Sequence, residues 1–166
     1  MTRKTNNKNT KPQDSGDKVD VNKDVESLKD TLPAHKIVQE GKALKLSPKS
    51  TNHVFYEIGR DPVDDELHVR LVGNEGGGLH SKEWIKLSDV LEVLSEQQDK
   101  PFKSSLLKPL FKGGSANNSA FLAACIRRMG LTIQAETSVF LHVVAPDFDK
   151  YRDELLALQE QNSNAE

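Results

Sequence analysis

Cysteine and long apolar runs are the two features most clearly missing from this chain of 166 residues. Cys125 is the only cysteine, which excludes an internal disulfide and a zinc site built from several cysteines. No stretch approaches the ~20 apolar residues of a membrane-spanning helix, and the N-terminus lacks the apolar core of a signal peptide. Length and composition together predict a soluble, cytoplasmic protein of about one domain, without membrane contact.

Acids are missing from one long segment, although the whole chain is nearly neutral. The sequence has 25 acids and 23 bases, a net charge of −2. By segment, the net charge is +1 for residues 1–31, −4 for 32–99, +6 for 100–135 and −5 for 136–166. Residues 100–135, here called the basic segment, hold no acid and six bases: Lys100, Lys103, Lys108, Lys112, Arg127 and Arg128. Polyanion binding depends on the local field, so nucleic acid is a candidate partner; solvated surface charge is the alternative.

Apolar residues are scarce at the N-terminus. Residues 1–31 contain five apolar residues and no aromatic one. Such a stretch cannot bury enough apolar surface to offset the entropy cost of ordering its backbone. We therefore predict a disordered tail over residues 1–33.

Residues 34–87 have the pattern of a small antiparallel β subdomain. The pieces 53–58 and 67–72 read as strands, and the acidic turn 61–65 between them completes a hairpin. Short apolar pieces on both sides of Gly41 are expected to form strands or turns. A further short strand is expected over residues 83–87, where Trp84 packs into the core.

Four glycines lie within residues 73–78, directly after the second strand of the predicted hairpin. This stretch lacks the Gly-Lys-Ser/Thr ending of a P-loop and the glycine spacing of a dinucleotide-binding loop. A flexible turn is therefore preferred over a ligand-binding loop.

The second half of the chain changes from strand to helix period. Helices are expected from Ser88 to Asp99, over 104–111 and from Ser119 to Met129, followed by strands over 131–135 and 139–144. Residues 147–166 are expected to form an amphipathic helix with a frayed end. Its apolar face consists of Phe148, Tyr151, Leu155 and Leu158. The fold class is therefore α+β.

The order of elements over residues 83–146 resembles a winged helix-turn-helix domain. Short strand, helix, helix, tight turn, helix and hairpin follow one another, and Gly113-Gly114 lie where the turn is expected. The resemblance implies that the third helix enters the DNA major groove and that the hairpin is the wing beside it. Double-stranded DNA is the partner that this resemblance implies.

This hypothesis assigns the basic segment to DNA contacts. Lysines would contact phosphates, whereas asparagine and arginine on the outer side of the third helix, together with Ala123, would face the bases. The assigned residues are Lys103, Lys108, Lys112, Ser115, Asn117, Asn118, Ser119, Arg127 and Arg128. Alternatively, Asn117 and Asn118 cap the helix.

Two further alternatives concern partners. The same helices could form an adaptor that binds a protein with an acidic surface, since winged helices also serve as protein-interaction modules. Residues 147–158 could form a homodimer contact, or pack back on their own domain.

Catalytic motifs are absent from the sequence. The five histidines show no paired metal-ligand spacing such as H-E-x-x-H, and the acids around residues 57–75 read as a solvated loop. Cys125 lies on an apolar helix face and is expected to be a buried filler, not a nucleophile. The sequence therefore predicts a non-enzymatic protein with no cofactor and no metal.

Overall fold

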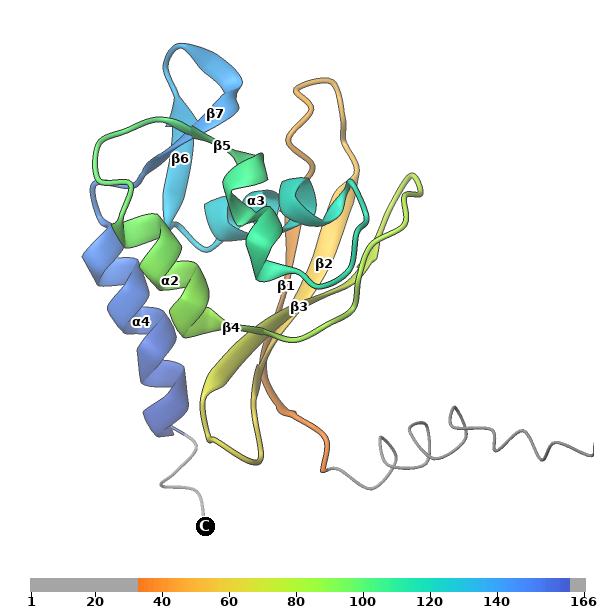
Figure 1. Cartoon of the computed structure of the whole chain (residues 1–166), viewed down its shortest axis with the longest axis vertical. Coiled ribbons are helices and arrows are strands. Elements are labelled where there is room, and N and C mark those ends of the chain that lie inside the picture. Colours follow the sequence, from red (N-terminus) through yellow and green to blue (C-terminus); the bar gives the residue numbers. More distant parts are fainter. Residues whose placement is uncertain (1–32, 162–166) are drawn as a thin grey trace, which may run out of the picture. The chain divides into compact units, whose positions relative to one another are not determined.

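The computed structural model describes residues 33–161, which carry an α+β fold (Figure 1). The predicted tail, apart from Pro33, and residues 162–166 lie outside the described part. Residues 34–161 belong to one compact unit with a continuous core. Its elements are β1 (Lys36–Leu44), β2 (His53–Arg60), β3 (Leu67–Asn74), β4 (Ile85–Lys86), α2 (Leu87–Ser95), β5 (Phe102–Lys103), the 3₁₀ helix η1 (Ser104–Leu110), α3 (Asn118–Arg128), β6 (Thr132–Ala135), β7 (Ser138–Val144) and α4 (Phe148–Gln161).

The first sheet has the strand order β1-β2-β3-β4 and is antiparallel throughout. The predicted hairpin is confirmed, with Tyr56 of β2 opposite Leu71 of β3. Of the strands or turns expected on both sides of Gly41, the strand alternative is confirmed, and β1 runs through this residue as one strand. The Tyr56 ring covers Gly41 so closely that no larger residue fits. Glycine here serves close packing rather than a turn.

The second sheet has three short strands in the order β5-β7-β6. β6 and β7 form the predicted hairpin, and β5 adds a third strand with Phe102 opposite His142. The predicted helix over 104–111 is instead the 3₁₀ helix η1, with Pro109 inside it. Proline has no N–H for an α-helical hydrogen bond, which disfavours a regular α-helix at this position.

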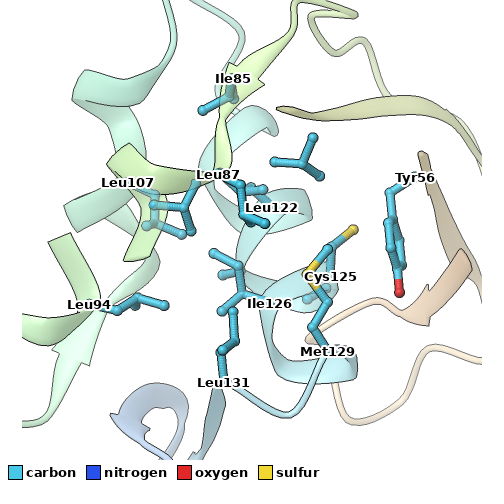
Figure 2. Close-up of a cluster of buried hydrophobic side chains, with 14 of the residues drawn as sticks. Tyr56, Ile85, Leu87, Leu94, Leu107, Leu122, Cys125, Ile126, Met129 and Leu131 are labelled. Carbon is cyan, nitrogen blue, oxygen red and sulfur yellow. The ribbon is translucent and has the colours of Figure 1, made fainter. Parts of the chain in front are cut away.

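Helix α3 runs through the centre of the core. Figure 2 shows Leu122, Cys125 and Ile126 among the buried side chains, with Tyr56 of the sheet close to Cys125 and Met129. The helix contacts β1 and β2 of the first sheet, η1 and β6. Cys125 is fully buried, as predicted, and burial raises the pKa of its thiol to about 12, so it stays protonated.

The last helix packs on its own domain. Phe148 and Leu155 of α4 are buried, and Tyr151 and Leu158 pack against the core. Gly130, just after α3, adopts φ +84° beneath the Tyr151 ring, as expected of a residue that ends a helix. The apolar face considered for a homodimer contact is thus used within the chain. None of the described helices is long and apolar enough to cross a membrane.

Candidate functional site

The bases of the basic segment lack acidic partners. Five of the six are exposed, and Arg127 is half-buried. Among the described residues, none of the six forms an ion pair. The acids of the neighbouring segments instead pair with other bases, for example Glu57 with Arg70 at 2.8 Å and Asp149 with Arg152 at 2.7 Å. The described acids of the neighbouring segments therefore form no side-chain ion pair with the basic segment.

Four of these six bases line two separate grooves, and Lys100 and Lys103 line neither. Lys108 and Lys112 line a groove together with the loop 113–116 that precedes α3. Arg127 and Arg128, at the other end of α3, line a second groove whose further members are Lys42, Leu44, His53 and Ala124. A long polyanion has several charges along its length and could contact both grooves, whereas a small anion would need only one.

The loop between η1 and α3 offers main-chain donors. Glu83 accepts hydrogen bonds from the N–H groups of Lys112 at 2.6 Å and Gly113 at 3.1 Å. Although burial alone would raise the pKa of Glu83, these bonds and that from Ser81 lower it, so the side chain is a carboxylate. Sequence reasoning missed this residue, because no motif links it to the loop. Among the described residues, the next N–H groups have no partner: those of Gly114, Ser115 and Ala116.

The polar residues at the start of α3 form hydrogen bonds with residues 79–81, which precede β4. Asn118 accepts a hydrogen bond from the Ser81 N–H at 2.8 Å and donates one to the Gly113 carbonyl at 3.1 Å. Ser115 and Asn117 both donate to the Leu79 carbonyl. Asn117 occupies the N-cap position of α3, as the capping alternative expected, but its side chain makes no capping hydrogen bond, and Asn118 is the first residue of the helix.

The prediction that one side of α3 faces outward is wrong for three residues. Asn118 and Ser119 are only 2% and 3% exposed, and Ala123 is buried too. Asn118 is hydrogen-bonded to Ser81 and Gly113, and α3 as a whole packs against η1, β1 and β2. The described part of α3 therefore does not offer these side chains to a groove.

Arg127, assigned to DNA by the sequence, contacts a buried histidine. Its Nη2 donates to His142 Nδ1 at 2.9 Å, and His142 stacks on Phe102 with 5.6 Å between ring centroids. Burial, with a smaller contribution from the Arg127 charge, lowers the pKa of His142 to about 4. His142 is therefore neutral near pH 7 and accepts the arginine hydrogen bond.

Acid is expected to destabilise the protein through His142. As the pH falls, the imidazole of the unfolded chain, with a pKa near 6.5, takes up a proton before that of the folded chain does. The stability that comes from keeping His142 neutral is therefore complete above pH ~6.5 and is lost as the pH falls to ~4. Between pH 7 and 4.5 the wild type should lose about 2 kcal/mol more unfolding free energy than His142→Gln. Urea unfolding at both pH values measures this. Equal losses in the two proteins would contradict the assignment.

A second polar cluster lies at one end of the first sheet. His35 precedes β1, Asp61 follows β2 and His68 lies in β3. His35 Nε2 is 2.7 Å from His68 Nδ1 and 3.2 Å from Asp61 Oδ2, and the latter two atoms are 3.5 Å apart. We call these three residues the histidine–aspartate cluster. Sequence reasoning missed it because its members lie far apart in the chain.

Burial and local hydrogen bonds shift the pKa values of His35 and Asp61. Burial lowers the pKa of His35, against an opposing influence from Asp61. The pKa of Asp61 is lowered mainly by the hydrogen bond that its Oδ1 accepts from the Val63 N–H at 2.7 Å. Trp84 was expected in the core but is half-buried, with its ring stacked on His35 at 4.1 Å.

Comparisons of the chain with protein-family models, with curated proteins and with solved structures gave no match.

Proposed function

We propose that the protein is a non-enzymatic binding protein that contacts the phosphate backbone of double-stranded DNA. The observation that carries this proposal is the set of six bases without an acid among them in sequence and without an ion pair among the described residues. Lysine and arginine that are free of acidic partners release condensed counterions when they meet phosphates, which supplies most of the affinity in sequence-independent binding.

The groove beside η1 supports the proposal with a second kind of donor. Lys108 and Lys112 lie beside the N–H groups of residues 114–116, which have no hydrogen-bond partner within the described part of the chain, and main-chain N–H groups in turns can bind anions. Glu83 already occupies the adjacent N–H groups, so this surface recognises carboxylate oxygens within the chain itself. Phosphate oxygens have the same acceptor chemistry.

The proposed contact differs from that of a helix-turn-helix reader. With Asn118 and Ser119 buried, α3 has no polar row to place against base edges. Contacts to phosphates position a protein on DNA without specifying sequence. The proposal is therefore binding with little sequence preference.

Binding of the full chain to random duplex DNA at increasing salt tests the proposal. We expect measurable binding at ~50 mM salt and an affinity that falls as the salt rises. The double variant Lys108→Gln/Lys112→Gln should lower the slope of log affinity against log salt by about 2, because each lost phosphate contact removes about 0.9. Fluorescence anisotropy of labelled DNA gives both quantities.

A lysine outside the basic segment supplies the matched control. Lys150→Gln, on exposed α4 surface, should leave the slope unchanged. Absence of binding at ~50 mM salt, or an affinity independent of salt, would overturn the proposal. An unchanged slope in the double variant would overturn the assignment of the groove.

An adaptor is the second candidate, and the β6–β7 hairpin favours it. Phe140 of this hairpin is 60% exposed and Ile133 is 45% exposed, and exposed apolar side chains of this size suit a protein partner. A chain that bound polyglutamate but not DNA of matched charge would support the adaptor.

A further inference from the structure

The histidine–aspartate cluster brings three metal-ligating atoms to one point. The distances 2.7, 3.2 and 3.5 Å join two imidazole nitrogens and one carboxylate oxygen. In tetrahedral zinc sites, with bonds of about 2.0–2.2 Å, neighbouring ligand atoms lie about 3.3 Å apart. A circle through the three atoms has a radius of about 1.8 Å, so a point just off their plane lies about 2.0–2.1 Å from each.

Each ligand is held in place by its surroundings. Asp61 turns Oδ2 toward the histidines because its Oδ1 accepts the N–H groups of Val63 and Asp64. His35 is held by stacking on Trp84, with rings inclined by only 10°. Because such ordering is already present before a cation arrives, little conformational freedom remains to be lost on binding.

The strand register explains why the cluster forms at this end of the sheet. β1 begins opposite the end of β2, with Lys36 paired to Arg60, and Gly59 pairs with His68. A Cβ at position 59 would lie 2.7 Å from Trp84 and 3.1 Å from His35 Cβ. Glycine at this position leaves the space that the stacked pair fills.

The nitrogen of His68 that faces away from the cluster also has a suitable neighbour. His68 Nε2 is buried and has no hydrogen-bond partner among residues 33–161, and the Asp64 carboxylate lies 3.9 Å from it. When a histidine binds a metal through one nitrogen, its other N–H commonly donates to a carboxylate. Lys86 already pairs with Asp64 at 3.1 Å and Glu66 at 3.2 Å, so these two acids form a surrounding shell rather than a second cation site.

We propose that His35, Asp61 and His68 bind a divalent transition-metal ion through Nε2, Oδ2 and Nδ1. Two imidazoles and one carboxylate suit zinc, iron or cobalt, whereas magnesium and calcium prefer oxygen ligands alone. Three protein ligands leave a fourth position for water or another small ligand. The site is independent of the bases that carry the proposed DNA binding.

Trp84 provides a direct readout because it is the only tryptophan in the chain and stacks on a proposed ligand. The experiment uses the full chain without an affinity tag. Co²⁺ should quench Trp84 fluorescence and saturate at one ion per chain, and Zn²⁺ should displace it and restore the signal. Calorimetry with Zn²⁺ alone should give the same stoichiometry.

Variants locate the site. Asp61→Asn and His35→Gln should each weaken Zn²⁺ binding by more than about tenfold, since even surrounding-shell changes cost 10–100-fold. His53→Gln is the matched control, because His53 and Glu75 form an exposed histidine–carboxylate pair at 2.9 Å elsewhere on the sheet. His53→Gln should bind Zn²⁺ as the wild type does. Circular dichroism confirms that each variant is folded.

Three results would overturn the proposal: no Zn²⁺ binding by the wild type, unchanged affinity in Asp61→Asn and His35→Gln, or an equal loss in His53→Gln. If a variant fails to fold, the wild type still decides the question through its unfolding temperature. Zn²⁺ should raise it in the wild type and in His53→Gln to the same extent, because a ligand that binds the folded state stabilises it. No rise in the wild type would contradict the site.

Discussion

Replacing Leu122 with alanine is expected to lower the free energy of unfolding by about 2–5 kcal/mol. Leu122 is 1% exposed and lies at the centre of the core, between Leu87 and Ile126 in Figure 2. Removing its branched end takes away apolar contacts and leaves a cavity that the packed neighbours fill only in part. Urea unfolding, followed by circular dichroism, measures the change.

The same helix supplies the control for this prediction. Arg128 is exposed and forms no ion pair among the described residues, so Arg128→Ala should change the free energy of unfolding by no more than about 0.5 kcal/mol. A loss below about 1 kcal/mol for Leu122→Ala would show that α3 is not the central helix of the core.

Local patterns account for the elements that sequence reasoning predicted correctly. The hairpin of β2 and β3 follows from alternating residues around an acidic turn, and α3 follows from an apolar stripe that ends before Gly130. Both depend on residues close together in the chain. The α-helix expected over 104–111 is a 3₁₀ helix instead, and it contains Pro109, which cannot donate an α-helical hydrogen bond.

The surroundings of α3 could not be predicted in the same way. Its period shows one apolar face, but α3 also contacts η1, β1 and β2, and its polar start is hydrogen-bonded to Ser81, 37 positions earlier in the chain. Small residues make this possible, since Ala123 and Ala124 are buried and allow close approach. The same sequence pattern fits a helix buried on several sides and a helix with one side exposed to DNA. Only contacts between residues far apart in the chain distinguish the two.

The same limit applies to both candidate sites. The sequence shows that the basic segment contains no acid. It does not show which bases line which groove, because that depends on where the two ends of α3 lie in the fold. The histidine–aspartate cluster has no motif at all, because His35, Asp61 and His68 are joined only by the register of three strands. Knowledge of that register is needed before the residues can be considered together.

Asn118 distinguishes a structural role from a DNA-reading role at a single residue. Its side chain joins the Ser81 N–H to the Gly113 carbonyl and is 2% exposed. Asn118→Ala should therefore lower the free energy of unfolding by at least about 2 kcal/mol, because two partly buried main-chain groups lose a partner and each costs about 1–3 kcal/mol. Urea unfolding measures the loss.

Two further substitutions make the test specific. Asn117→Ala removes one exposed hydrogen bond to Leu79 and should cost less than about 1 kcal/mol. Asn118→Asp keeps the acceptor for the Ser81 N–H but turns a carboxylate oxygen toward the Gly113 carbonyl. It should therefore recover only part of the stability that Asn118→Ala loses, or none of it. The opposite pattern, with wild-type stability in Asn118→Ala and a loss of DNA affinity, would return this asparagine to the role of an adenine reader, since an asparagine that pairs with a base contributes to binding and not to folding.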